Sequence, residues 1–128
     1  MINLGILGLN SNRLKRINNR TFRNLGKLTE LMLYENEIEE IEFHSFADLK
    51  SLKMLHLYSN KIASLDMQIF TGLESLEELW LQKNELKSVE PVFNTLVNLV
   101  SICLDRNKID AIDTKTLLKP LILIHLVI

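Results

Sequence analysis

The segment LKMLHLYSNKIASL, residues 52–65, contains the pattern that decides the fold. Its fixed positions read LxxLxLxxNxIxxL, where x stands for a residue of any type. The same spacing occurs in LTELMLYENEIEEI, residues 28–41, and in LEELWLQKNELKSV, residues 76–89. Because the aliphatic positions are kept while the residues between them change, the segment is one copy of a repeated unit.

The unit recurs along the chain with a period close to 24 residues. Counted from the first leucine of each copy, the units are 4–27, 28–51, 52–75, 76–98 and 99–120, with an incomplete sixth from 121. Two residue types recur in register, namely Asn12, Asn36, Asn60, Asn84 and Asn107, and Phe22, Phe46, Phe70 and Phe93, with Leu117 in the fifth phenylalanine slot. Residues 1–128 are therefore predicted to form a single array, and neither end carries a cap.

The LxL core of each unit alternates with period two, which predicts a short β-strand whose leucines share one face. A single unit cannot bury that face, but stacked units can, with one strand per unit in a parallel sheet at about 4.8 Å spacing. The asparagine follows the strand, where its amide can pair with backbone groups of adjacent coils. The phenylalanines are expected to stack beneath the opposite side of the coil.

This pattern resembles the leucine-rich repeat family, and the unit with phenylalanine is similar to the typical subclass found in Toll-like receptors and small proteoglycan cores. The resemblance implies an α/β fold, a right-handed leucine-rich-repeat solenoid with a parallel β-sheet on the concave face. Short helical or 3₁₀ turns and irregular chain are expected on the convex face. The resemblance also implies a non-catalytic protein–protein interaction module, part of a larger receptor or extracellular protein.

The residues between the leucines of each strand should point outward on the concave face. We predict that this face binds another protein or peptide. The predicted site consists of Glu30, Met32, Tyr34, Met54, His56, Tyr58, Glu78, Trp80 and Gln82. Tyrosine and tryptophan are enriched at binding hot spots, and exposed methionine suits adaptable contacts. The alternative is that cross-strand aromatic pairs only stabilise the sheet.

Charge is distributed unevenly although the formal net charge is only −1. The low net charge predicts no nucleic acid as a partner. Unit 4–27 has six basic residues and no acidic one, whereas unit 28–51 has seven acidic residues and one lysine. The residues in equivalent slots are Arg13 and Glu37, Lys15 and Glu39, and Arg16 and Glu40. Stacking in register would make these opposite charges neighbours. The alternative interpretation is that the basic residues of unit 4–27 form a docking patch for a polyanion.

No catalytic or metal-binding arrangement emerges from the sequence. Cys103 and His125 are expected to share a column of adjacent strands, but a thiol–imidazole dyad also needs an orienting group and a pocket. His56 and His125 should be too far apart to share a metal, and His44 falls on the convex side. We therefore predict no enzyme activity, cofactor or metal. The triplet Asn19-Arg20-Thr21 is a possible glycosylation site in a secreted parent.

The two ends lead to further expectations. Without caps, the chain is expected to be an internal piece of a longer protein, or a short array with possible end-to-end self-association. The C-terminal apolar run is too short to cross a bilayer, so no direct membrane insertion is expected. The resemblance favours an extracellular or receptor-ectodomain location, while the lack of a signal peptide leaves the cytoplasm open. Two further functions remain, a structural spacer or self-associating array and an intracellular substrate-recruiting arm of a larger enzyme complex.

Overall fold

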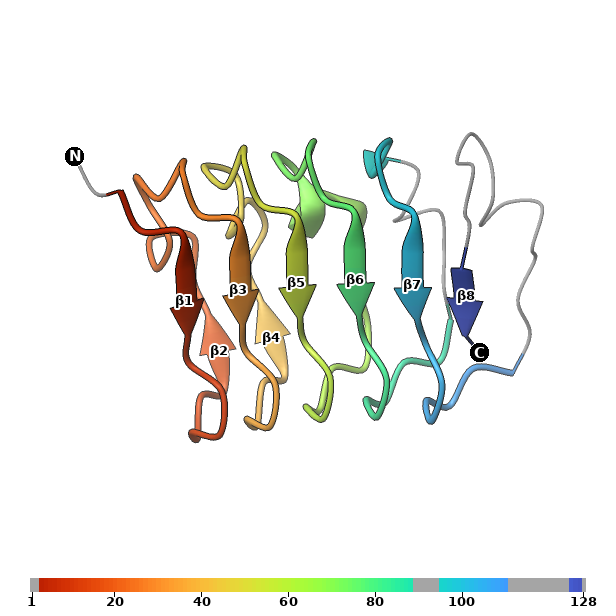
Figure 1. Ribbon diagram of the computed structural model, residues 1–128. Coiled ribbons are helices and arrows are strands. Elements are labelled where there is room, and N and C mark those ends of the chain that lie inside the picture. Colours follow the sequence, from red (N-terminus) through yellow and green to blue (C-terminus); the bar gives the residue numbers. More distant parts are fainter. Residues whose placement is uncertain (1–2, 89–94, 111–124, 128) are drawn as a thin grey trace.

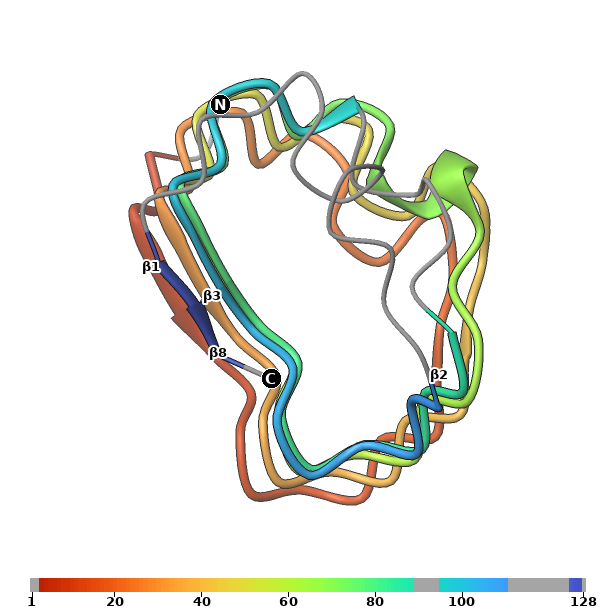
Figure 2. The ribbon, with the colours of Figure 1, turned by 90° about the vertical axis from the view of Figure 1, so that its right-hand side faces the viewer.

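Six short strands form one parallel sheet that runs the length of the molecule (Figure 1). The computed structural model of the 128-residue chain describes residues 3–88, 95–110 and 125–127. The strands are β1 (Ile6–Gly8), β3 (Glu30–Met32), β5 (Met54–His56), β6 (Glu78–Trp80), β7 (Ser101–Cys103) and β8 (His125–Val127), and they pair in that order. Seen along the stack, successive coils superpose (Figure 2). The predicted solenoid is confirmed.

The strand register follows the repeat. Leu31 lies opposite Leu55, and Leu55 lies opposite Leu79, so equivalent residues are one repeat apart. Leu79 then lies opposite Ile102, which shows that the strand of the fifth unit stays in register although the fourth unit is one residue shorter.

The last strand corrects one prediction. His125 pairs with Ser101, and Cys103 pairs with Val127, so Cys103 and His125 do not share a column. A displacement of two residues keeps the alternation of an apolar strand, so the sequence pattern alone did not distinguish the two registers. The predicted boundary at residue 121, Phe93 and Leu117 lie outside the described residues.

The strand leucines and the phenylalanines fill the interior of the coil. Leu31, Leu55 and Leu79 are fully buried, as are Phe46 and Phe70. Burying each such side chain contributes about 1.5–3 kcal/mol. The rings of Phe22 and Phe46 are stacked, with centroids 6.0 Å apart and an interplanar angle of 16°. The predicted stacking of phenylalanine rings is therefore present between Phe22 and Phe46, and Phe70 is buried in the equivalent place of the next coil.

The asparagines join adjacent coils. Asn60 accepts at Oδ1 from the backbone N–H of Ile38 at 3.0 Å. Its Nδ2 donates to the carbonyls of Leu33 and Leu57, both at 3.0 Å. Equivalent bonds are made by Asn36, Asn84 and Asn107. These four residues form the asparagine ladder, and they satisfy backbone groups that would otherwise cost about 1–3 kcal/mol each.

The residue before each asparagine adopts a left-handed backbone conformation. The φ angles are 58° at Ser11, 55° at Glu35, 57° at Ser59, 56° at Lys83 and 57° at Arg106. This conformation costs a residue with a side chain roughly 1–2 kcal/mol. It turns the chain out of the strand while the N–H still donates to the next coil, as from Glu35 to the carbonyl of Tyr58 at 3.1 Å.

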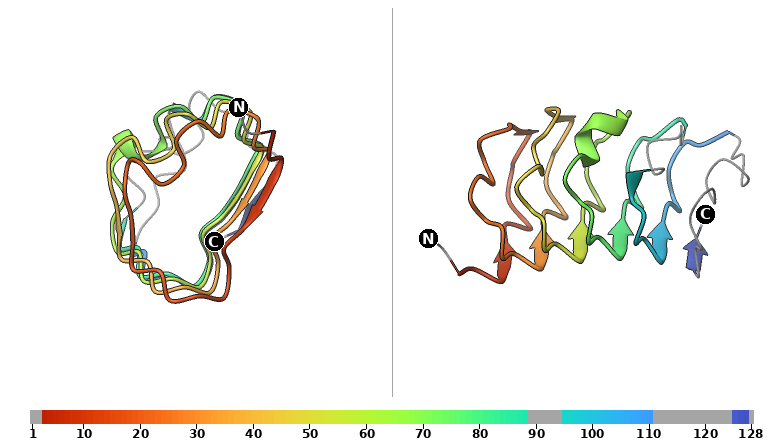
Figure 3. Two further views of the ribbon diagram at one scale, coloured as in Figure 1. Left: turned by 90° about the vertical axis from the view of Figure 1, so that its left-hand side faces the viewer. Right: turned by 90° about the horizontal axis from the view of Figure 1, so that it is seen from above.

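The convex side carries little regular structure, as expected (Figure 3). It contains the 3₁₀ helix η1 (Met67–Phe70) and a two-stranded parallel sheet of β2 (Arg16–Ile17) and β4 (Glu40–Ile41), which was not predicted. Arg16 Nε lies 3.4 Å from Glu40 Oε2, so this charge pair forms between stacked coils. Both side chains are largely exposed, and such pairs contribute about 0–1 kcal/mol. None of the helices in the described part of the chain has the length and apolar character needed to cross a bilayer.

Candidate ligand-binding face

The outward residues of the strands stand in rows across the sheet. Strand register places Met54 between Glu30 and Glu78, and His56 between Met32 and Trp80. A further row lies just beyond the strands. All nine predicted site residues are half-buried on this surface, namely Glu30, Met32, Tyr34, Met54, His56, Tyr58, Glu78, Trp80 and Gln82. We call this surface the strand face; its role in binding stays a prediction.

Four rings pack together at the centre of the strand face. Tyr34 and Tyr58 are stacked, with centroids 4.5 Å apart and an interplanar angle of 5°. His56 and Trp80 lie 5.0 Å apart, and Tyr58 and Trp80 lie 6.1 Å apart. These four residues are the aromatic cluster. Ring pairs at such distances contribute about 0.5–1.5 kcal/mol beyond their buried area, so the cluster also stabilises the sheet.

Two carboxylates hold rings of the aromatic cluster in place. His56 Nε2 lies 3.0 Å from Glu30 Oε1, and these side chains are only 12% and 22% exposed. Trp80 Nε1 donates to Glu78 Oε2 at 3.3 Å. Burial raises the pKa of the Tyr58 hydroxyl above its usual value, and the neighbouring Tyr34 and Glu35 add to the shift. Tyr58 therefore stays neutral at physiological pH and keeps a proton to donate.

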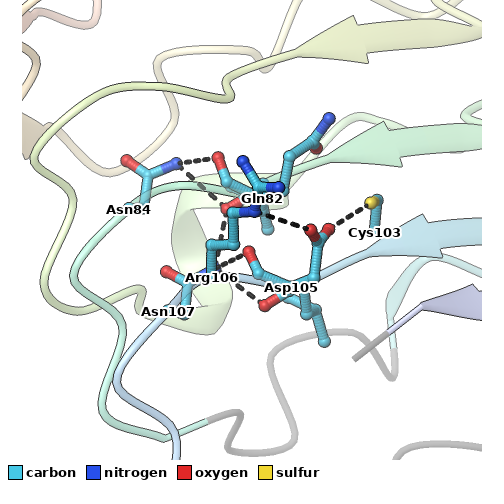
Figure 4. A network of polar contacts seen from close by, with 8 residues as sticks. Gln82, Asn84, Cys103, Asp105, Arg106 and Asn107 are labelled. Carbon is cyan, nitrogen blue, oxygen red and sulfur yellow. Dashed lines mark hydrogen bonds and ion pairs between the residues drawn. The ribbon is translucent and has the colours of Figure 1, made fainter.

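The thiol on the strand face is not activated. Cys103 Sγ donates to Asp105 Oδ1 at 2.9 Å (Figure 4). Burial, and then the hydrogen bond to Asp105, raise the pKa of Cys103 to about 11. A thiol nucleophile reacts as the thiolate, so Cys103 is protonated and weakly reactive at neutral pH.

Charge on the strand face has one sign. In the five coils whose side chains the structure describes, fifteen outward positions can be counted along the rows. Three of them are acidic, namely Glu30, Glu78 and Asp105, and none is lysine or arginine. Gln82 stands in the same row as Tyr58 and Asp105, and its Oε1 is buried without a hydrogen-bond partner among the described residues. Sequence reasoning had no signal for this unsatisfied acceptor.

The convex side carries an open groove of about 550 Å³. It lies between residues 39–44 and residues 64–69, and Asn19 also lines it. The backbone N–H of Asn19 donates to Glu42 Oε2 at 3.0 Å, and the Asn19 side chain is exposed. Its glycosylation stays a prediction. In the described residues no group of three or more histidine, cysteine, aspartate or glutamate side chains could hold a metal ion.

Comparison with known proteins supports this architecture. The sequence profile of a family described as leucine rich repeat matches residues 2–62 and 52–109. No curated protein matches the chain. A similar solved structure is the crystal structure of the TLR13–ssRNA13 complex, a Toll-like receptor with single-stranded RNA, at 33% sequence identity and a TM-score of 0.76. The match covers 80% of this chain, which spans only 15% of the length of that chain.

This comparison overturns the exclusion of nucleic acid. The prediction rested on a net charge of −1 for the whole chain. A similar array occurs in a complex with single-stranded RNA, so that exclusion is wrong. Net charge averages over all surfaces and does not describe the one that meets a ligand.

The family and the Toll-like-receptor-like fold are typically non-catalytic. The family profile extends over more than half of the chain, and the strands, asparagines and phenylalanines of the described coils occupy equivalent places. This protein belongs to the leucine-rich repeat family.

Proposed function

We propose that this protein is a non-catalytic binding module that holds another protein or peptide on its strand face. The aromatic cluster is the observation that carries the proposal. Tyr34, Tyr58 and Trp80 are large, half-buried side chains held by neighbouring rings, and Trp80 is also held by Glu78, so little side-chain freedom remains to be lost on binding. Such rings form the centres of many protein interfaces.

The setting of this module is part of the same proposal. Similarity to a Toll-like receptor supports a larger receptor-like or extracellular parent. The strand face of this chain measures on the order of 300 Å², from five strands at about 4.8 Å and three or four residues along each. A standard interface covers about 800 Å² on each partner. This segment alone is therefore expected to bind weakly, with neighbouring surface adding to the interface.

A second candidate is single-stranded RNA. The specific observation in its favour is the stacked pair of Tyr34 and Tyr58, because bases stack on aromatic side chains with about 1–3 kcal/mol each. The similar TLR13 structure also contains such an RNA. Against it, Glu30 and Glu78 would meet the phosphates, and no basic residue of the described strand face offsets them. A protein partner is therefore favoured.

Affinity capture with matched variants tests the proposal. Wild-type protein, the double variant Tyr58→Ala/Trp80→Ala and the control Phe43→Ala are immobilised and exposed to an extract of the source cells. Phe43 is 49% exposed and lines the convex groove, so the control removes an aromatic side chain away from the strand face. Circular dichroism confirms that each variant is folded, and bound components are identified with and without ribonuclease treatment.

The expected result is that the double variant loses proteins that the wild type and Phe43→Ala both retain, independently of ribonuclease. Loss of the captured material after ribonuclease would favour the RNA candidate instead. If a folded double variant captures the same proteins as the wild type, the strand face is not the binding surface. The aromatic cluster would then be a structural element, as in a spacer.

A further inference from the structure

We infer that the strand face accepts a basic segment of its partner, with arginine or lysine side chains placed over Glu30, Glu78 and the aromatic cluster. This inference rests on the proposed function and specifies the chemistry of the ligand. Three observations carry it: the single sign of charge on the face, the anchoring of its carboxylates, and the unpaired acceptor of Gln82.

The charge pattern is complementary to a cation. Three acidic residues and no lysine or arginine occupy the fifteen outward positions of the five described coils. Basic residues are present outside the rows, for example Lys53, which directly precedes β5 and whose Nζ lies 3.7 Å from Glu77 Oε1. Arg106 Nε lies 3.9 Å from Asp105 Oδ2 and offsets that charge, so the negative potential of the rows is centred on Glu30 and Glu78, where it attracts positive side chains.

The carboxylates are already oriented for such a contact. Glu30 uses Oε1 with His56, and Glu78 uses Oε2 with Trp80, so each side chain is held at one oxygen. The other oxygen of each carboxylate can accept from a guanidinium or ammonium group. The same cation can then lie against the face of Trp80 or Tyr58 in a cation–π contact. Carboxylate and ring together select a cation over a neutral side chain.

Gln82 adds an acceptor that has no partner among the described residues. Its Oε1 is buried, so a ligand donor reaches it only when the side chain rotates, and that bond would recover the free energy lost by the unpaired acceptor. Arginine carries five N–H donors and no acceptor, whereas a phosphate carries acceptors only. The unmatched group on this surface is therefore of the type that arginine satisfies.

The spacing of the two anchored carboxylates suggests the form of the ligand. Glu30 and Glu78 belong to the same row, with Met54 between them. Two strand spacings separate their backbones by about 10 Å. In a polyproline II helix, residues three apart lie on one side and are separated by about 9.3 Å. A peptide with arginine at every third position can therefore address both carboxylates while its backbone crosses Met54.

Trp80 provides the assay, because it is the single tryptophan of the chain. Its emission is followed while the protein is titrated with the peptide Arg-Pro-Pro-Arg-Pro-Pro-Arg. Matched titrations use Glu-Pro-Pro-Glu-Pro-Pro-Glu and a single-stranded oligouridine RNA. The arginine peptide is expected to bind at least tenfold more tightly than either, and its affinity should fall as salt is raised.

Charge-neutral variants locate the contact. Glu30→Gln and Glu78→Gln each keep an oxygen that can accept from His56 or Trp80 but remove the negative charge. Because the double variant removes the negative charge of both carboxylates, it should weaken arginine-peptide binding by about tenfold. The control Glu39→Gln/Glu85→Gln removes the same charge from two exposed residues outside the rows, and it should change the affinity less than twofold.

The outcomes separate this inference from the proposed function. Equal affinity for the arginine and glutamate peptides, or tighter binding of RNA, would overturn the inference. So would an undiminished affinity in the variant Glu30→Gln/Glu78→Gln. If the capture experiment still depends on Tyr58 and Trp80, the proposed function survives that result and only the ligand chemistry is wrong. If capture is also independent of these rings, both fail.

Discussion

Replacing Asn60 by alanine should destabilise the array more than any substitution of an exposed residue. The change removes the acceptor for the backbone N–H of Ile38, which is left without a partner inside the coil. It also removes one donor each from the carbonyls of Leu33 and Leu57. Those carbonyls are not orphaned, because Leu33 still accepts from Asn36 at 3.1 Å and Leu57 from Asn84 at 3.0 Å.

The expected loss of stability depends on the difference between the N–H group, which loses its only acceptor, and the two carbonyls, which each keep one donor. One buried N–H without an acceptor costs about 1–3 kcal/mol, and each carbonyl that loses one of two bonds adds roughly 0.5 kcal/mol. The expected loss in the free energy of unfolding is therefore about 2–4 kcal/mol, a large share of the roughly 5–15 kcal/mol that holds a domain together. Urea unfolding followed by Trp80 emission and by circular dichroism measures it.

Asn12→Ala is the matched control, because Asn12 occupies the same slot of the repeat but is exposed. Its Nδ2 donates to the carbonyls of Leu9 and Asn10 at 3.0 and 3.2 Å, where water can replace it. We expect a loss below about 1 kcal/mol. Equal losses in the two variants, or a loss at Asn60 below about 1 kcal/mol, would refute the reasoning that the ladder serves buried backbone groups.

Three further predictions concern other features of the coil. Lys83 has a φ of 56°, a conformation that asparagine tolerates and valine does not. Lys83→Asn should therefore raise the free energy of unfolding by a few tenths of a kcal/mol, and Lys83→Val should lower it by about 1 kcal/mol. Thermal melts that rank the two variants the other way would contradict this. Phe46→Ala should lower the free energy of unfolding, measured in urea, by about 3–5 kcal/mol, because the ring is fully buried and stacked on Phe22. A loss below about 1 kcal/mol would mean that the coil collapses around the cavity. The raised pKa of Cys103, about 11, means that the folded state favours the thiol, so its stabilising effect is present below the thiol's ordinary pKa and is lost as pH rises toward 11. Cys103→Ala should reduce this loss of stability with rising pH. At pH 8, iodoacetamide should label the thiol of folded wild-type protein more slowly than that of urea-unfolded protein. Equal labelling rates would show that the thiol is not shielded.

Much of the fold could be predicted because the leucine spacing determines which side of the strand is buried. Alternation within LxL sends Leu31 inward and Met32 outward, and one repeat length then aligns every coil with the next. The position of Asn60 after the strand likewise indicated a polar contact between coils, which the structure contains. The rows of the strand face follow from the two-residue alternation within each strand and from the length of the repeat.

Other features depend on interactions that the pattern does not record. The register of β8 was missed because a shift of two residues preserves alternation. The left-handed turn before each asparagine was missed because Glu35 and Lys83 have no preference for that conformation; inter-coil hydrogen bonds impose it. The unpaired oxygen of Gln82 depends on packing around one side chain. The exclusion of nucleic acid rested on total charge alone, which does not rule out base stacking on aromatic side chains.

The asparagine ladder also bears on how such a chain can change over generations. Each junction between described coils uses the same bond, from an amide to a carbonyl one repeat earlier, as Asn60 does with Leu33 and Asn84 with Leu57. Unequal recombination that adds or deletes one whole unit leaves every junction chemically alike, while a partial unit would misplace the amide. Length can thus vary in whole-unit steps, and each duplicated unit brings a fresh set of outward residues for selection to alter.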